Sequence, residues 1–470
     1  MINYTPDEPI VAIATPLSPS ALSLIRTSGK NCIELVSKIF SRPKKLMNAE
    51  GNTIVYGWII DNTMTEDVPS LNKIDEVLVS VFRSPKSFTG EDMVEISCHG
   101  GTSVVRSIYK LLLKNGFREA ERGEFTFRSY IHGKTDLTKA EAIREIIESK
   151  TDTSRSHATE RLAGSLFEKI NLIKNEIINI SASIEVAVEY PEDEETIADS
   201  FDCSKLNAVA KDLQMLLDSW QSEKLFQDGV RVVLCGKTNA GKSSLFNTLL
   251  KEERAIVSDI AGTTRDFLES WVNFAGLPVR LFDTAGLRDT DDAIEKQGVA
   301  LARSLTSEAD VVLYLVDNVV GASKDDIEFL QNCVTPCVVV WNKCDVEEKN
   351  SALDGNSLIG NNTHAIFSEC KVSAKTGYGI SNLVKTVSEN VLERNTSAVI
   401  GAGLGSARQK KAVAEAIESV THALENAKSY TLDAVVQDLD DALHALAEVT
   451  GEVTPDDILD SVFSNFCVGK

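Results

Sequence analysis

The chain has 470 residues, with 70 acidic and 48 basic side chains and a formal net charge of −22 at pH 7. A chain of this length is too long to fold around one hydrophobic core, so we expect about three domains. Because acidic side chains outnumber basic ones, we do not expect the chain to bind nucleic acid through an overall positive surface charge. No apolar run approaches the roughly 20 residues of a membrane-spanning helix.

The nine cysteines lack paired CxxC spacing, so we expect reduced thiols in a cytoplasmic protein without a membrane segment. Cys333 and Cys337 are the closest pair. Because Cys337 opens a predicted strand, zinc is not expected there.

Residues 1–133 mix short strand-like runs with one helical pattern, which predicts an α+β domain. Residues 9–16 and 76–82 read as strands, and 103–114 reads as a helix that ends at Asn115-Gly116. Polar turn motifs accompany them: FTGED at 88–92, CHGG at 98–101 and GEFT at 123–126. The residues alone indicate a site for a small anionic or amide-bearing ligand, and a structural role for His99 is favoured.

Long helices are expected on both sides of the chain's centre, at 134–227 and at 391–470. Between 162 and 184 the apolar residues recur on one helical face. They are Leu162, Leu166, Ile170, Ile173, Ile177, Ile180 and Ile184. A second helix is expected at 203–220, and helical spacing returns at 413–424 and 439–446. Each block presents one apolar face, so the two are expected to pack together around an inserted module at 228–390.

The inserted module opens on a phosphate-binding pattern. Residues 230–235 predict a buried strand, Gly236 to Ser243 fits GxxxxGK[ST], and a helix is expected from Lys242. The two glycines let the backbone wrap a phosphate at the positive end of that helix. Lys242 is expected to reach the outer phosphates, and the Ser243 hydroxyl is expected to bind Mg²⁺.

Three further motifs indicate that the nucleotide is GTP. DTAG at 283–286 follows a predicted strand, so that Asp283 can hold the metal through water and Gly286 can offer its amide to the last phosphate. NKCD at 342–345 follows another strand, and the Asp345 carboxylate can accept both donors of guanine's Watson–Crick edge. SAK at 373–375 supplies amides for the guanine oxygen. These ordered motifs predict a Ras-like P-loop domain that binds and hydrolyses GTP.

With these motifs the whole chain resembles one family, the MnmE (TrmE) tRNA-modification GTPases. The front motifs, DIAGTTRD at 259–266 and the terminal FCVGK at 466–470 carry the resemblance beyond the GTPase module. It implies an N-terminal tetrahydrofolate-binding and dimerisation domain at 1–133, a helical domain formed from 134–227 and 391–470, and a G domain at 228–390.

The resemblance also implies the chemistry. With the FAD-containing partner MnmG, a homodimer would add an aminomethyl or carboxymethylaminomethyl group to carbon 5 of the wobble uridine of tRNA. The one-carbon unit would come from 5-formyl- or 5,10-methylene-tetrahydrofolate. The implied folate contacts are Arg26, Glu95, Lys134 and Lys470, with Cys467 as a catalytic candidate.

The implied GTP site covers four stretches of the chain. Its residues are Asn239, Ala240, Gly241, Lys242, Ser243, Ser244, Ser258, Asp259, Ile260, Ala261, Gly262, Thr263, Thr264, Asp283, Thr284, Ala285, Gly286, Asn342, Lys343, Asp345, Ser373, Ala374 and Lys375. Thr264 would be the second Mg²⁺ ligand.

Hydrolysis needs a substitute for the usual water-orienting glutamine, because Leu287 occupies that position. The family points to Glu295 for this role, although a glutamate in a first helical turn is otherwise common. A K⁺ ion would replace an arginine finger. It would be bound by Asn239 and by carbonyls of Ser258, Ile260 and Thr263.

The chain departs from the family in three places. Residues 17–23 lack the glycines that are common there, Arg122 replaces a proline, and Ser258 replaces a threonine. The first change leaves the local folate geometry open.

Two other functions remain open at this point. A regulatory GTPase of ribosome assembly would have the same central module but would need neither the front domain nor a terminal thiol. A folate-dependent one-carbon enzyme to which GTP is incidental fits the full guanine-reading set poorly.

Overall fold

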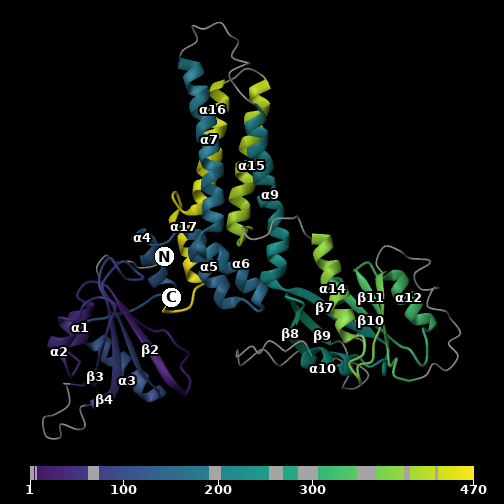
Figure 1. Cartoon of the computed structure of the whole chain (residues 1–470), viewed down its shortest axis with the longest axis horizontal. Coiled ribbons are helices and arrows are strands. Elements are labelled where there is room, and N and C mark those ends of the chain that lie inside the picture. Colours follow the sequence, from purple (N-terminus) through teal and green to yellow (C-terminus); the bar gives the residue numbers. More distant parts are fainter. Residues whose placement is uncertain are drawn as a thin grey trace. The chain divides into compact units, whose positions relative to one another are not determined.

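The computed structural model describes Thr5 and residues 8–61, 73–189, 203–252, 268–283, 305–346, 366–395, 403–428 and 432–469. The chain forms two compact units (Figure 1), one of Met1–Arg144 with His444–Lys470 and one of Glu145–Leu443. The four domain limits expected from the sequence stay predictions. Within the described ranges, no helix combines the length and the apolar character needed to cross a bilayer.

The first unit contains a six-stranded sheet in the order β3-β4-β5-β2-β1-β6. All neighbours are antiparallel except β1 and β6. The strands are β1 (Ile10–Ile13), β2 (Ser20–Ser28), β3 (Thr53–Ile60), β4 (Lys73–Phe82), β5 (Met93–Gly100) and β6 (Arg118–Glu119). Alternating burial along β3 and β4 shows why these sequences form strands with one face in a core. The α+β prediction for this part is confirmed.

Helices complete the first unit. They are α1 (Cys32–Ser37), α2 (Pro43–Met47), α3 (Thr102–Lys114), α4 (Glu124–Ile131) and α17 (Asp456–Ser464). The predicted helix at 103–114 is confirmed as α3, and its buried face (Val105, Ile108, Leu111 and Leu112) packs into the core of the sheet. Its last turn is closed by Asn115 and Gly116, the latter at φ +100°.

The end of the chain is part of this first unit. Phe463 and Phe466 of the α17 region are buried with Leu137 and Ala140. Phe463 also meets Phe127 edge to face, with ring centroids 5.4 Å apart. Val468 then bridges to Arg122 in an antiparallel pair. The terminal segment is therefore docked on the first unit.

Gly123 permits this docking, because an added Cβ would lie 2.5 Å from the Phe463 carbonyl oxygen and its φ is +70°. Gly123→Ala is expected to cost about 1–3 kcal/mol of local stability, from left-handed backbone strain and the lost close approach. Hydrogen exchange of 456–469 should rise in this variant. Gly133→Ala is the matched control, since its φ is +66° and no atom lies within 4 Å of the added Cβ. Equal exchange in both variants would contradict a role in docking.

Long helices form part of the second unit, namely α6 (Asp152–Ala163), α7 (Ser165–Glu189), α9 (Cys203–Asp228) and α15 (Ala407–Lys428). α5 (Leu137–Glu148) and α16 (Leu432–Thr450) each extend across the division between the units. α9 packs against both α7 and α15, so helices from before and after the inserted module share contacts, as predicted. α9 continues eight residues beyond the predicted limit at 220.

The predicted start of the helical face at 162–184 was wrong. Leu162 does not begin the face that contains Leu166 and Ile184, because α6 ends at Gly164 in a left-handed cap with φ +110°. Leu162 belongs to α6 and is 36% exposed, whereas the other six predicted face residues are buried. The even spacing of the apolar residues concealed the break.

The second sheet forms the core of the inserted module, in the order β12-β11-β10-β7-β9-β8. It is parallel except for the β8–β9 pair. Its elements are β7 (Val230–Gly236), α10 (Lys242–Glu252), β8 (Leu268–Phe274), β9 (Leu277–Asp283), β10 (Val311–Asp317), α12 (Lys324–Asn332), β11 (Cys337–Asn342), β12 (Ile366–Lys371) and α14 (Ile380–Asn395). The continuous apolar runs of β7, β10 and β11 are buried, as a covered parallel sheet requires. The α/β prediction for this module is confirmed.

Candidate functional site

The loop between β7 and α10 has the backbone that phosphate binding needs. Gly236 has φ +134° and Gly241 has φ +95°. A Cβ at Gly236 would collide with the Leu315 carbonyl oxygen, and one at Gly241 with the Asn342 amide. Both positions therefore exclude any other residue. The loop leads into the first turn of α10, whose free N–H groups favour an anion.

Lys242 is oriented into this loop. Its side chain is 7% exposed, and its ammonium donates to the carbonyl oxygens of Gly236 (2.9 Å) and Lys237 (2.8 Å). The exposed Ser243 hydroxyl follows on the first turn of α10. Asn239 is also exposed and holds a left-handed backbone at φ +65°.

Asn342 joins three separate parts of the chain. Its side chain is 1% exposed, donates from Nδ2 to the Ala240 carbonyl (2.9 Å) and accepts at Oδ1 from the Ala374 N–H (3.0 Å). The Thr248 hydroxyl of α10 also donates to the Ala374 carbonyl, at 2.7 Å. Hydrogen bonds within the chain therefore connect the phosphate loop to residues 373–375.

The Asp345 carboxylate is exposed and preoriented. Ser373 Oγ donates to it at 2.7 Å, and the same hydroxyl accepts from the Thr376 N–H at 3.3 Å. The hydrogen bond from Ser373 lowers the pKa of Asp345, and the nearby charge of Lys375 lowers it further. Asp345 is thus an anionic acceptor pair at neutral pH, which matches the two adjacent donors of guanine.

Lys343 and Asp283 complete the described part of the site. Lys343 has φ +68° and pairs with Asp317 at 2.7 Å. Asp283 ends β9 next to Leu234 of β7 and is 4% exposed. A carboxylate here and the Ser243 hydroxyl are hard oxygen donors, so the residues present fit Mg²⁺.

One ion pair at the phosphate loop was not predicted from the sequence. Lys237 contacts Asp325 at 2.6 Å, which raises the pKa of Lys237. Asp325 lies in the first turn of α12, which Ser323 caps through a capping box with Asp326. No spacing in the sequence links these residues; the packing of α12 beside the phosphate loop brings them together.

Several predicted site residues lie outside the described residues. They are Ser258, Asp259, Ile260, Ala261, Gly262, Thr263, Thr264, Thr284, Ala285, Gly286, Glu295 and Lys470.

In the first unit, Arg26 and Glu95 face each other on β2 and β5. Arg26 Nη2 contacts Glu95 Oε1 at 2.8 Å, and Arg26 Nη1 donates to the Gly469 carbonyl at 3.0 Å. The guanidinium lies near the Phe88 and Phe125 rings. Arg26 Nε is buried with no hydrogen-bond partner among the described residues. A cation between two rings, with one donor left over, fits a flat ligand that carries acceptors.

Lys134 and Cys467 lie in the same unit. The Lys134 ammonium donates to the Pro85 carbonyl at 3.0 Å, next to the 88–92 motif that contains Phe88. The Cys467 thiol is exposed, two residues before Gly469. The structure therefore groups Arg26, Glu95 and the chain's end, while Lys134 contacts the loop beside them.

A buried ion network supports this grouping. Arg128 and Glu124 are both 0% exposed and contact each other at 2.8 Å, while Arg128 also contacts Glu91 at 2.9 Å. Glu124 further pairs with Arg118 at 2.6 Å. Burial alone would raise the pKa of Glu124, but hydrogen bonds from Arg118, the Glu121 N–H and Arg128 outweigh it and lower that pKa. The conspicuous glutamates of FTGED and GEFT thus have a structural partner that sequence reasoning did not identify.

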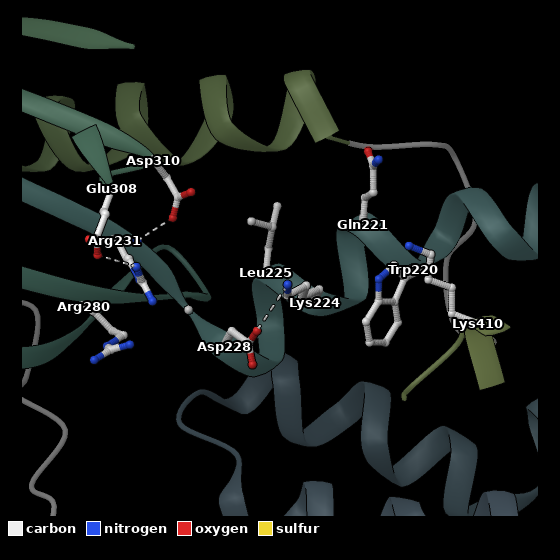
Figure 2. Close-up of a pocket in the computed structure, with 11 residues that line it drawn as sticks. Trp220, Gln221, Lys224, Leu225, Asp228, Arg231, Arg280, Glu308, Asp310 and Lys410 are labelled. Carbon is white, nitrogen blue, oxygen red and sulfur yellow. Dashed lines mark hydrogen bonds and ion pairs between the residues drawn. The ribbon is translucent and has the colours of Figure 1, made fainter. Parts of the chain in front are cut away.

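A separate cavity of about 620 Å³ lies at the opposite end of β7 from the phosphate loop. Figure 2 shows Arg231 joined to Glu308 and Asp310 on one wall and Lys224 joined to Asp228 on another. Trp220, Leu225 and Lys410 also line it. Because acidic side chains of this cavity contact basic side chains or backbone N–H groups beside them, its lining carries charges of both signs and no uniform electrostatic potential is expected.

The fold and the loop geometry define a P-loop guanine-nucleotide-binding protein. Similarity to known proteins identifies its family. The profile described as "MnmE helical domain" matches residues 137–467, and "GTP-binding protein TrmE N-terminus" matches 9–134. A "tRNA modification GTPase MnmE" of Treponema denticola is 49% identical, over 100% of this chain and 99% of the relative. The Borrelia recurrentis and Carboxydothermus hydrogenoformans proteins of the same name are 41% and 39% identical, over 99% of this chain and 99% and 100% of theirs. The chain belongs to the MnmE family of tRNA modification GTPases.

Solved structures are similar to parts of the chain. Aquifex aeolicus Era bound to GDP·AlF₄⁻ is 26% identical, covering 40% of this chain and 66% of its own, with a TM-score of 0.27. The G domain of the T. maritima FeoB iron transporter is 24% identical, covering 34% of this chain and 98% of its own, with a TM-score of 0.26.

Proposed function

We propose that this chain is a GTP-hydrolysing enzyme of tRNA modification. The observation that carries the proposal is the preformed frame in which Asn342 ties the phosphate loop to residues 373–375 beside the Asp345 carboxylate. The relatives named tRNA modification GTPases are similar to this chain over 99–100% of its length, which includes the part that forms this frame. A guanine nucleotide fits the frame because its base needs an anionic double acceptor and its phosphates need amides and an ammonium.

The residues have distinct tasks when GTP binds. Lys242 exchanges its two carbonyl partners for phosphate oxygens, so it is held near its working position beforehand. Ser243 and Thr264 would hold Mg²⁺, with Asp283 acting through water, and the bound ion would neutralise phosphate charge. Glu295 would orient the attacking water, in the role that Leu287 cannot fill.

A K⁺ ion is the proposed source of the remaining positive charge. Asn239 would hold it together with carbonyls of Ser258, Ile260 and Thr263. The support is that Asn239 lies in the phosphate loop with an exposed side chain and a left-handed backbone.

GTP turnover is therefore expected to be roughly 10²-fold faster in K⁺ than in Na⁺, because a pre-placed positive charge is worth about that much in the transition state. Phosphate release measured at equal ionic strength checks this. Asn239→Ala should remove the preference for K⁺ while the affinity for GDP changes little. Equal rates of the unaltered protein in the two salts would contradict the proposal.

The chemistry on tRNA is proposed in finer detail from the family. With an FAD-containing MnmG partner, a homodimer in the cytoplasm would add the aminomethyl or carboxymethylaminomethyl group to carbon 5 of the wobble uridine. Arg26, Glu95, Lys134 and Lys470 would bind the tetrahydrofolate that supplies the one-carbon unit, and Cys467 would lie beside it. The unmatched Arg26 Nε and the two nearby rings support a flat, acceptor-bearing ligand.

Nucleoside analysis of tRNA tests this function. Cells that lack the chain should contain unmodified wobble uridine, and the intact gene should restore the modification. Lys242→Ala should fail to restore it if GTP is required, and Arg26→Met should fail if the folate site is required. An unchanged profile in the deletion strain would favour the alternative, a regulatory GTPase of ribosome assembly.

A further inference from the structure

Four cysteines lie on one face of the nucleotide-binding sheet, and one of them, Cys344, is part of the 342–345 motif. Cys235 of β7 and Cys337 of β11 are buried in one hydrophobic cluster, and the partly buried Cys333 packs against it. Cys333 follows the last residue of α12, and Cys337 is the first residue of β11. A short turn thus brings two thiols from different elements together.

Only residues 334–336 separate Cys333 from Cys337, and Cys333 packs against the hydrophobic cluster in which Cys337 is buried. Cys333 Sγ also lies 3.3 Å from the Thr335 carbonyl within the same turn. The adjoining Val334 is 93% exposed, so this turn faces solvent, whereas Cys337 is 0% exposed. The Cys333 side chain is therefore partly exposed, and the Cys337 side chain is buried.

The two thiols differ in acidity, and Cys333, which is to attack the peroxide, is the more acidic one. A hydrogen bond from Cys337 lowers the pKa of Cys333 to about 7, while donating that bond, together with burial, raises the pKa of Cys337. Burial raises the pKa of the third thiol, Cys235, to about 11, and its Sγ contacts Thr306 Oγ1 at 3.5 Å. Among the described residues, no group of three or more His, Cys, Asp or Glu could hold a metal ion, which argues against a thiolate metal site.

We propose that Cys333 and Cys337 are a redox-modification site that closes to a reversible disulfide when the protein meets a hydroperoxide. The Cys333 thiolate attacks the terminal peroxide oxygen, the O–O bond breaks, and the leaving oxygen departs as water or alcohol after protonation. The Cys337 sulfur then attacks the sulfenic sulfur of Cys333, and the hydroxyl leaves as water with the Cys337 proton. Two thiols and one hydroperoxide thus give one disulfide, one water from the sulfenic acid, and one alcohol (or a second water, when the peroxide is hydrogen peroxide).

The site lies where a covalent link can affect nucleotide binding. α12, which ends beside Cys333, begins with Asp325, the partner of Lys237 in the phosphate loop. β11, which starts at Cys337, ends at Asn342. The disulfide would join the far ends of two elements whose near ends contact the nucleotide frame.

Mass spectrometry of the full-length protein tests the proposal directly. Cys333 and Cys337 are the cysteines of a single tryptic peptide, residues 325–343. After one equivalent of hydrogen peroxide and then iodoacetamide, the doubly alkylated peptide should fall about tenfold and be replaced by an unalkylated form two hydrogens lighter. Dithiothreitol should restore double alkylation. The alkylation rate of Cys333 in untreated protein should rise with a midpoint near pH 7.

Two variants and one control separate the steps. Cys337→Ser should leave a sulfenic acid on Cys333 that dimedone captures, and Cys333→Ser should leave Cys337 alkylatable only after unfolding. Cys203→Ser, at an exposed thiol on α9, should leave the disulfide unchanged. If the cysteine variants fail to fold, the unaltered protein still decides. A peptide that stays doubly alkylated, over-oxidation without a disulfide, or a link from either thiol to Cys235 would overturn the proposal.

Discussion

Asp345→Asn is expected to weaken binding of GTP and GDP by roughly 10²–10⁴-fold, because two hydrogen bonds to a charged acceptor are lost at about 1.5–3 kcal/mol each. The Asp345 carboxylate is exposed, and its described side-chain hydrogen bond comes from the Ser373 hydroxyl, so the fold is not expected to depend on this charge. Titration with a fluorescent guanine nucleotide measures the loss.

A change of base provides the specific control. Xanthine presents a carbonyl where guanine presents an amino group, so the amide of the Asp345→Asn variant can donate to it. The variant should bind XDP more tightly than GDP, whereas Asp218→Asn, on the exposed face of α9, should leave both affinities unchanged. Undiminished affinity for GDP in Asp345→Asn would exclude the assigned contact with the base.

Arg128→Met is expected to destabilise the first unit by about 3–5 kcal/mol. The substitution keeps the volume but leaves Glu124, which is 0% exposed, and Glu91 without their shared cation. Hydrogen exchange of β5 amides in increasing urea reports the stability of this unit. Lys38→Met is the matched control in the same unit, because its pair with Glu34 is exposed (53% and 52%) and should contribute less than about 1 kcal/mol.

The pH dependence of this difference has a defined sign. The pKa of Glu124 is lowered in the folded chain, so its ionised form stabilises the fold above the ordinary glutamate range, and this contribution is lost as the pH falls through the native value. The stability gap between the unaltered protein and Arg128→Met should therefore be full at pH 7 and narrow below about pH 4.5. A gap that stays constant on acidification would indicate a packing effect alone.

Much of the nucleotide frame was predictable because it is encoded locally. The strand at 230–235, the glycine positions and the helix from Lys242 are adjacent in sequence, and their spacing alone defines the loop. The helix at 166–184 was predictable for the same reason, since its buried face recurs with helical period. Its start was not, because Leu162 fits that period while Gly164 breaks the helix.

Contacts between residues far apart in the sequence were not predicted. The contacts of Lys237 with Asp325 and of Arg128 with Glu91 each depend on where a helix packs. The motifs FTGED and GEFT stood out as sequences, but only the fold reveals that their glutamates share one arginine. Roles inferred for residues outside the described ranges, such as Glu295, continue to rest on the family.

The pairing of Arg26 with the Gly469 carbonyl joins residues 443 positions apart. During translation, the apolar surface that Phe463 and Phe466 cover is made long before those two rings leave the ribosome. The front unit of a nascent chain must therefore remain incomplete until synthesis is nearly finished, with that surface available to chaperones. A chain interrupted within the nucleotide-binding region would never bury it, which would mark truncated products for removal.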